Sequence, residues 1–215
     1  PLSDTYKNGV SQAEGSCEVY YFRNPTANVG IDGVRNLADT TEPTAGTATL
    51  NSVESVGNTL TEIARFYQHP ALSAALDLSG VITTTLFGNK NGAPQAYFRA
   101  ELYDYNPADG TTALLGGVNS TNVTGNKTNE ATTILLTLSS SHTLASGHRL
   151  LWVVKGASDH ASQTNTLGLN YDGVSSQSRS RFCTASAPSL VIDKSASTAN
   201  VVPGGALVYA IDFAN

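Results

Sequence analysis

Apolar and polar residues alternate with a two-residue period in many short runs along the chain. From residue 62 onward these runs recur about every 8 to 12 residues, between segments rich in Gly, Asn, Asp, Pro and Ser. No stretch keeps the 3.6-residue apolar period of an amphipathic helix for about a dozen residues. This pattern predicts an all-β fold, an antiparallel β-sandwich of jelly-roll-like type. The expected strands are Glu18–Phe22, Glu62–Gln68, Leu78–Phe87, Ala96–Tyr105, Thr112–Leu115, Ala131–Leu138, Arg149–Gly156, Thr166–Tyr171 and Arg179–Cys183.

Turn-forming residues mark where the strands are expected to end. Residues 24–58 differ from the rest, because prolines and glycines interrupt them repeatedly, and we expect a long loop there with one short strand at Thr47–Val53. The expected turns are Gly88–Gly92, Asn106–Gly110, Ser139–Ser141, Ser158–His160 and Asp172–Gly173.

The run Ala96–Tyr105 shows two distinct faces. Alternate residues on one side are apolar and predict a core face, formed by Phe98, Ala100 and Leu102. The run Arg149–Gly156 is apolar on both sides, which predicts a central strand that buries Trp152.

The second face of Ala96–Tyr105 is polar and aromatic. We expect it to face solvent or a partner, or to lie under the 24–58 segment. Aromatic rings on such a face can stack on sugar rings while polar neighbours bind hydroxyl groups, so it is a candidate glycan-binding face. Pairing of the tyrosines across strands is the alternative. The face consists of Tyr97, Arg99, Glu101, Tyr103 and Tyr105.

The two cysteines each adjoin a predicted strand. Cys17 precedes the first strand and Cys183 ends the last, and first and last strands of an antiparallel sandwich often pair. We therefore expect a disulfide, with two buried thiols as the alternative. A disulfide implies an oxidising, extracytoplasmic compartment. Neither cysteine lies in a CxxC motif or a Cys/His cluster, so a zinc site is not expected.

Composition narrows the classes of partner. Only 13% of residues are charged, against about 25% in an average soluble domain, and the net charge is −5. We expect no nucleic-acid partner, no anionic membrane surface and no membrane span, because no apolar run approaches about 18 residues. The chain starts at Pro1 and contains no Met, which indicates a processed form or a fragment. We expect a flexible arm at 1–16, a sandwich domain at 17–187 and a C-terminal segment at 188–215.

Motifs of enzymes and cofactor-binding proteins do not occur. The sequence lacks GxSxG, HExxH, Walker and dinucleotide motifs, and its histidines have no ligand spacing (His69, His142, His148 and His160). We therefore expect no catalytic site, no metal, no cofactor and no enzymatic activity. Asp104–Gly110 partly matches a calcium loop, but its spacing fails, and a hairpin turn with Gly110 at positive φ is expected instead.

Three Asn-x-Ser/Thr sequons lie close together in a polar stretch. They make this segment a candidate for glycosylation in a secreted protein. The candidate acceptors are Asn119, Asn122 and Asn126.

The C-terminal segment has two further strand-like runs, Leu190–Asp193 and Ala206–Phe213, around a Pro-Gly-Gly turn. It resembles the start of a repeat domain found in tandem on bacterial and archaeal cell-surface proteins. The residues that carry the resemblance are Lys194-Ser195-Ala196, Val202-Pro203-Gly204-Gly205 and Val208–Asn215.

The rest of the chain is similar, more loosely, to β-sandwich modules of secreted bacterial surface proteins. The matching stretches are Val19–Pro25, Leu102–Tyr105 and Ser146–Leu151. This resemblance implies an extracellular, non-enzymatic protein and no particular ligand.

Two strands cannot bury a core alone, so the C-terminal segment is expected to pair with something else. Our leading hypothesis is a structural surface protein, a filament or surface-layer subunit whose copies join head to tail by β-strand addition. A carbohydrate-binding or adhesive module of a larger surface protein is the alternative, and the segment can also be the first piece of a truncated repeat domain or fold back on its own body. The candidate assembly residues are Leu190, Val191, Ile192, Leu207, Tyr209, Ile211 and Phe213.

Overall fold

The computed structural model describes residues 17–46, 48–92, 95–124, 129–183, 191–196 and 209–214. The chain divides into two compact units. One is the body Cys17–Thr184, and the other contains strands β12 (Val191–Ala196) and β13 (Tyr209–Ala214). The described residues form strands, turns and loops and include no helix, so the predicted all-β class is confirmed. None of them therefore belongs to an apolar helix of membrane-spanning length.

Within the described body, eleven strands form one continuous hydrogen-bonded sheet. The order along it is β3-β10-β5-β11-β1-β2-β4-β9-β6-β7, and β8 pairs with β5 off this path. These pairings are antiparallel except the short one between β2 and β4, which is parallel. The strands are β1 (Cys17–Asn28), β2 (Val34–Asp39), β3 (Thr49–Val56), β4 (Thr61–Gln68), β5 (Leu76–Asn91), β6 (Ala96–Tyr105), β7 (Thr112–Asn119), β8 (Glu130–Leu144), β9 (Arg149–Ser158), β10 (Thr164–Tyr171) and β11 (Arg179–Cys183).

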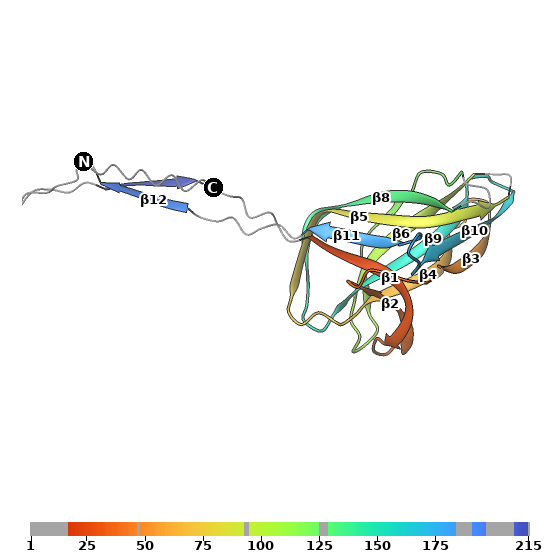
Figure 1. The fold of residues 1–215 in the computed structure, drawn as a ribbon, viewed down its shortest axis with the longest axis horizontal. Helices are drawn as coiled ribbons and strands as arrows, with labels where there is room; N and C mark the ends of the chain where they lie inside the picture. Colours follow the sequence, from red (N-terminus) through yellow and green to blue (C-terminus); the bar gives the residue numbers. More distant parts are fainter. Residues whose placement is uncertain are drawn as a thin grey trace, which may run out of the picture. The chain divides into compact units, whose positions relative to one another are not determined.

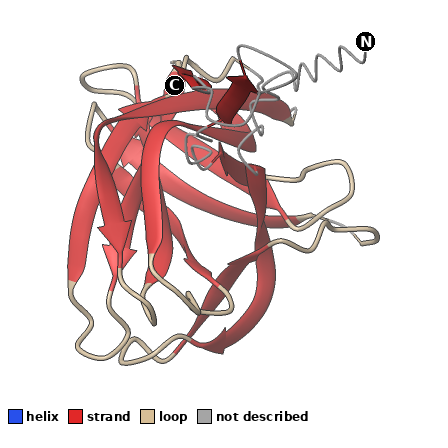
Figure 2. Ribbon diagram, turned by 90° about the vertical axis from the view of Figure 1, so that its left-hand side faces the viewer, coloured by secondary structure: helices blue, strands red, loops and turns tan. Residues whose placement is uncertain are grey.

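The sheet folds over itself into a sandwich. Its long strands curve around a common interior, with loops gathered at their ends (Figures 1 and 2). One core cluster holds Phe98 of β6 and Trp152 of β9 together with Leu86 of β5 and Ile134 of β8. Side chains from both layers thus share one interior, and the fold is an antiparallel, jelly-roll-like β-sandwich, as predicted.

The predicted core register is confirmed. Phe98, Leu102 and Trp152 are 0–2% exposed and Ala100 is 7% exposed. Strand β9 is covered on both faces, because a second apolar cluster lies on its other side and includes Leu151 and Val153. The remaining members of that cluster are Val29, Leu37, Tyr67 and Tyr105.

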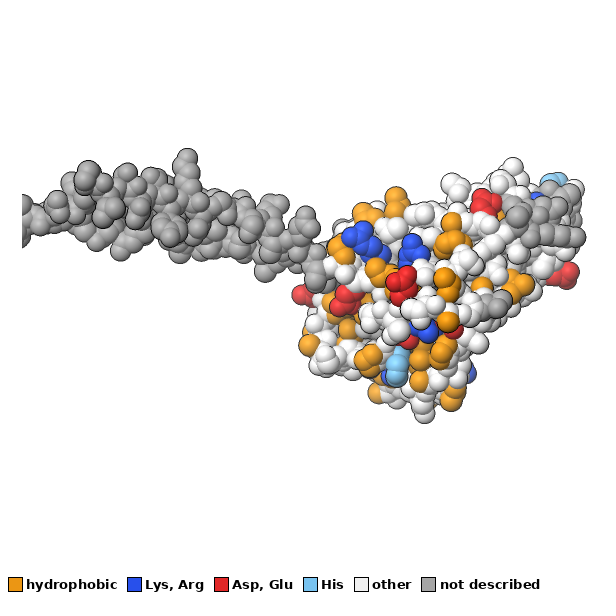
Figure 3. All heavy atoms as spheres, in the orientation of Figure 1, with side chains coloured by type: hydrophobic (Ala, Val, Ile, Leu, Met, Phe, Trp, Pro, Cys, Tyr) orange, Lys and Arg blue, Asp and Glu red, His pale blue; other side chains and the backbone are white. Residues whose placement is uncertain are grey.

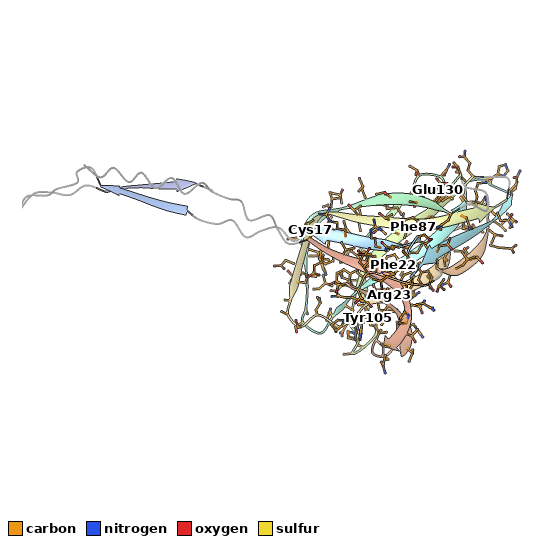
Figure 4. The ribbon with its side chains drawn as sticks, in the orientation of Figure 1. Cys17, Phe22, Arg23, Phe87, Tyr105 and Glu130 are labelled. Carbon is orange, nitrogen blue, oxygen red and sulfur yellow. A yellow bond between two sulfur atoms is a disulfide. The ribbon has the colours of Figure 1, made fainter. Side chains whose placement is uncertain are left out.

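Cys17 and Cys183 form a disulfide, as predicted. The two residues lie opposite each other in the antiparallel pairing of β1 with β11 (Figure 4). The first and last strands of the body are therefore neighbours joined by a covalent bond. A disulfide indicates folding in an oxidising compartment.

The segment 24–58 is more regular than predicted. β1 runs on to Asn28, β2 was not expected, and β3 extends the predicted short strand to Val56. Pro25 is tolerated inside β1 because the pairing with β2 shifts register between Arg23 and Thr26, so its missing N–H interrupts no ladder there.

Two predicted turns are misplaced, because β5 runs on to Asn91 and β8 continues through Ser139–Ser141. β5 continues through Gly88, which pairs with Leu169 of β10. A Cβ atom on Gly88 would lie 2.4 Å from the Phe98 ring, so this glycine marks a close approach between layers. Likewise Ser139–Ser141 continue β8, whose pairing with β5 resumes beyond an irregularity at Leu78/Gly80. The predicted turn after β6 is confirmed, with φ of 75° at Gly110.

β12 and β13 pair antiparallel with each other, from Val191 opposite Ala214 to Ala196 opposite Tyr209. Val191 and Ile192 lie on β12, and Tyr209, Ile211 and Phe213 lie on β13. Several predictions fall outside the described residues, namely those for the side chains of both strands and for residues 1–16, Leu190, Leu207 and the Pro203–Gly205 turn.

Candidate functional site

The predicted polar face of β6 lies on the outer side of the layer formed by β4, β9 and β6, hereafter the outer face. Glu101 is its centre. Its carboxylate accepts hydrogen bonds from Arg99 Nε at 2.9 Å and from the Tyr103 hydroxyl at 2.7 Å, and it pairs with Lys155 Nζ of β9 at 2.8 Å. The Glu101 side chain is only 8% exposed. These groups therefore hold one another in place, and Tyr97 lies half-buried on the same face.

The pKa values of this cluster follow from its contacts. Burial by itself would raise the pKa of Glu101, but hydrogen bonds from Lys155, Tyr103 and Arg99 outweigh it and leave the pKa below its ordinary value. Burial and the hydrogen bond to Glu101 raise the pKa of Tyr103 to about 12. Glu101 is thus a carboxylate and Tyr103 a neutral phenol at neutral pH.

Tyr105 lies beneath the loop that joins β1 and β2, within the 24–58 segment (Figure 4). Asp32 donates its backbone N–H to the Tyr105 hydroxyl at 3.3 Å. The Tyr105 ring meets Tyr67 edge-on at 5.0 Å and is fully buried. The face was expected either to face solvent or a partner or to lie under the 24–58 segment, and Tyr105 is covered by that segment. Its ring is therefore unavailable for stacking on a ligand.

A cleft opens between β2 and β4, and sequence reasoning did not predict it. The two strands pair with each other only at Leu37–Tyr67 and Ala38–Gln68, and they do not pair with each other toward their N-terminal ends. The cleft has a volume of about 530 Å³. Its lining residues come from β1 to β4 and the β1–β2 loop: Thr26, Asp32, Val34, Arg35, Asn36, Asn51, Glu62, Ala64, Arg65 and Tyr67.

Hydrogen bonds fix the polar groups of this cleft. Tyr67 donates its hydroxyl hydrogen to Asp32 Oδ2 at 2.5 Å. Arg65 forms two bonds with the Glu62 carboxylate, at 2.8 and 2.9 Å. Asn36 donates from Nδ2 to the Tyr171 hydroxyl at 3.1 Å, and burial raises the pKa of Tyr171.

A smaller hollow of about 110 Å³ adjoins the cleft on the outer face. The two share Glu62 and Arg65, so this ion pair forms the ridge between them. The other residues of the hollow are Tyr103, Thr112, Leu151, Val153 and Lys155. Tyr103 is thus the member of the predicted glycan-binding face that lines an open site. Across the cleft and the hollow together, carboxylates, amides and guanidinium groups lie beside apolar side chains. This mixture is suited to a neutral, hydroxyl-rich ligand.

The structure brings together two histidines that looked unrelated in the sequence. His142 Nε2 lies 3.1 Å from one oxygen of Asp104, and His148 Nδ1 lies 2.7 Å from the other. Asp104 lies on β6, His142 on β8 and His148 directly before β9, so their proximity depends on how these strands are arranged in the sandwich, which no local signal reveals. Among the described residues, no three or more His, Cys, Asp or Glu side chains are arranged to hold a metal ion.

The sequons differ in their surroundings. Asn119 is exposed, and its Oδ1 accepts a hydrogen bond from Arg99 at 3.0 Å. Asn122 donates from Nδ2 to Asp159 at 2.8 Å and to Gln95 at 2.5 Å, so a glycan on this nitrogen would cost at least one of these bonds. Asn126 lies outside the described residues.

No family model matches the sequence, and no curated protein matches it. The fold is similar to parts of several solved hydrolases. An aminopeptidase from the marine sediment archaeon Thaumarchaeota archaeon matches 77% of this chain with 12% identity and a TM-score of 0.56. An alpha-amino acid ester hydrolase matches 76% with 14% identity and a TM-score of 0.54. A CocE/NonD family hydrolase from Staphylococcus aureus matches 81% with 8% identity and a TM-score of 0.56.

These similarities correct one prediction. The sequence led us to expect no enzymatic activity, and this expectation is contradicted, because the structural neighbours just named are hydrolases. At such identities the likeness shows the fold alone. The matched regions make up 36%, 35% and 37% of those three chains, so this chain spans about a third of their length.

Proposed function

We propose that the body is a carbohydrate-binding module of an extracellular surface protein. The observation that carries this proposal is the pair of adjoining depressions, the cleft and the hollow, that share the Glu62–Arg65 ridge. Together they offer hydrogen-bonding groups fixed by their neighbours and an apolar floor, the two features that a sugar ring requires.

The charge of the cleft favours a neutral ligand. It contains two acidic residues, Asp32 and Glu62, and two basic ones, Arg35 and Arg65. Acidic and basic side chains are also interspersed over the face of the body seen in Figure 3. A nucleic acid would favour a basic surface instead.

Three observations support an extracellular module of a longer polypeptide. The Cys17–Cys183 disulfide indicates an oxidising compartment. The C-terminal segment resembles the start of a cell-surface repeat domain, and an exposed sequon at Asn119 is compatible with a secreted protein. In the hydrolases of similar fold, the matched sandwich is likewise only about a third of the chain.

Binding to a glycan array and calorimetry test this proposal. Arg65→Ala and Tyr103→Ala should each weaken binding about tenfold or more, which corresponds to ~1.4 kcal/mol. Arg181→Ala is the matched control, because Arg181 is exposed on β11 and lines neither depression. Arg65 and Glu62 are both substantially exposed, so losing their ion pair should leave the fold intact. Equal affinities of wild type and both site variants would refute the assignment.

A second candidate function is assembly by strand addition, with copies joined head to tail into a filament or surface layer. The pairing of β12 with β13 as a separate two-stranded sheet favours it. Two strands alone are marginally stable in water, and each has a second edge that another strand can pair with. A neighbouring copy would supply that strand.

Deletion of residues 189–215 tests the second candidate. The shortened protein should remain a soluble, disulfide-bonded monomer, whereas the full chain should form polymers visible by negative-stain electron microscopy. Identical assemblies from both proteins would show that this segment is not the connector.

A further inference from the structure

We infer that the body dimerises through the edge of β8 that faces away from β5, by antiparallel pairing with β8 of a second copy. This inference does not depend on the proposed carbohydrate-binding function. The residues that line the cleft and the hollow lie outside β5 and β8, so the dimer leaves both depressions open.

β8 is an edge strand. In the part of the body that the structure describes, β5 is the one strand hydrogen-bonded to it, and β8 runs along the border of the body in Figure 1. The pairing with β5 is unbroken from Phe87 opposite Ala131 to Gly80 opposite Leu138. Along this stretch, alternate backbone N–H and C=O groups of β8 point away from β5, so a further strand can pair with them.

This edge lacks the features that normally prevent edge-to-edge pairing, which are charged side chains, prolines and bulges. The sequence from Ala131 to Ser141 contains no charged residue and no proline. The strands at the two ends of the sheet order, β3 and β7, do have such features. β3 carries the exposed Glu54, and β7 has an extra residue, Leu115, where its pairing with β6 shifts register. β8 is therefore the edge best suited to pairing with another strand.

A second copy fits this edge because the edge is complementary to itself. Its side chains on the outer surface of the layer, at Thr133, Leu135 and Thr137, are exposed. A two-fold axis at Leu135 places the two Leu135 side chains opposite each other and Thr133 opposite Thr137. A two-fold axis at Ile134 places Leu135 opposite Thr133 instead. Like charges meet in neither register, so two copies pair without the repulsion that a charged edge would cause.

Exposed apolar side chains lie beside this edge. Leu135 is 58% exposed and Val81 of β5 is 51% exposed. Val81 lies opposite Thr137, two residues from Leu135 on β8, so Val81 and Leu135 are diagonal neighbours on the same face. Pairing of two copies brings both Leu135 side chains together and removes part of their surface from water. Apolar burial therefore adds to the new backbone hydrogen bonds.

Analytical ultracentrifugation of the full chain tests the inference, and wild type should approach twice the mass of one chain as its concentration rises. Leu135→Lys and Leu135→Glu should each raise the dimer dissociation constant about tenfold or more, because like charges then face each other across the two-fold axis. An equimolar mixture of the two variants should dimerise again, since Lys and Glu from different copies attract. Leu114→Lys is the matched control, because Leu114 on the edge strand β7 is 56% exposed, and it should leave the dimer unchanged.

Hydrogen exchange measured by mass spectrometry identifies the paired strand, also within a larger assembly. About half of the amides in 131–138 should exchange more slowly in wild type than in Leu135→Lys, namely those that point away from β5. Residues 206–213 should exchange alike in both proteins.

Three outcomes would overturn the inference: a monomeric wild type, a mixture of Lys and Glu variants that does not dimerise, or protection of 131–138 and 206–213 that is lost together. The last would show that β8 accepts the C-terminal strand of a neighbour instead. Leu135 lines neither depression, so sugar binding by Leu135→Lys should equal that of wild type. The dimer and the carbohydrate proposal are thus tested separately.

Discussion

At the scale of single residues, Glu101 holds the neighbouring side chains of the outer face in place. A buried carboxylate is costly unless donors surround it, and here Arg99, Tyr103 and Lys155 all bond to it. Tyr103 and Lys155 also line the hollow. The side chains that would contact a ligand are therefore positioned by a group that does not line either depression itself.

This arrangement predicts a pH dependence of stability. The pKa of Glu101 in the folded protein is below the ordinary value of 4.5, so its stabilising contribution is present above about pH 4.5 and is lost as pH falls through the folded pKa. Glu101→Gln should be less stable than wild type at pH 7, and the difference should shrink below pH ~4.5. Urea unfolding between pH 3 and 7 measures it. Glu54→Gln, at an exposed position of β3, is the control, and an equal loss there would contradict the prediction.

Leu102 gives a prediction for the core. Its side chain is 2% exposed inside the main cluster, so Leu102→Ala should cost about 2–5 kcal/mol in the free energy of unfolding. Leu114 on β7 is 56% exposed, and Leu114→Ala should cost less than about 0.5 kcal/mol. Denaturant titration compares them. A cost below about 0.5 kcal/mol for Leu102→Ala would contradict the assigned register.

At the scale of elements, the β1–β2 loop forms one wall of the cleft and is held by a close backbone contact. Gly30 has φ of +117°, and a Cβ there would lie 2.3 Å from the Pro107 carbonyl oxygen. Ile31 donates its N–H to that same oxygen at 3.0 Å. The turn after β6 thus positions the loop that carries Asp32.

Gly30→Ala should therefore destabilise the protein by more than the ~1–3 kcal/mol of an unfavourable backbone conformation. Gly33→Ala is the control in the same loop, because Gly33 also has positive φ but nothing lies within 4 Å of its Cβ position. Thermal unfolding compares the two variants. Equal losses would show that the contact with Pro107 is not what requires glycine.

Elements with local signals were predictable from the sequence. The alternation in Ala96–Tyr105 matches the bounds of β6, and Arg179–Cys183 matches β11. Glycine and proline led to wrong turn predictions where a contact or pairing with another strand, and not a turn, accounts for the residue. Gly88 is required by the approach of Phe98 from the facing layer, and Pro25 lies at a register shift. Both causes become visible only when the strand pairing and the contact between the two layers are known.

The candidate site was only partly predictable for the same reason. Tyr103 and its neighbours on β6 could be found, because a strand places alternate residues on one face. The cleft could not be found, because it exists only where β2 and β4 stop pairing. Its closing contact joins Asp32 to Tyr67, which no periodicity connects.

At the scale of the whole molecule, the Cys17–Cys183 disulfide spans 166 residues and joins the first and last strands of the body. In the chain-entropy model, a loop of this size lowers the entropy of the unfolded chain enough to stabilise the fold by about 5 kcal/mol. The strands that it joins also pair through their backbones, and buried Phe182 stacks on Tyr20 at 5.5 Å. The bond therefore reinforces a contact that other interactions already form.

We therefore expect Cys17→Ser/Cys183→Ser to fold into the same sandwich, with a free energy of unfolding lower by at most about 5 kcal/mol. Reduced wild-type protein should unfold at the same urea concentration as this double variant, because both lack the same constraint, while the oxidised protein should unfold later. Thiol alkylation followed by mass spectrometry should find no free cysteine in native wild type. Two alkylated thiols there would remove the structural basis for an oxidising compartment.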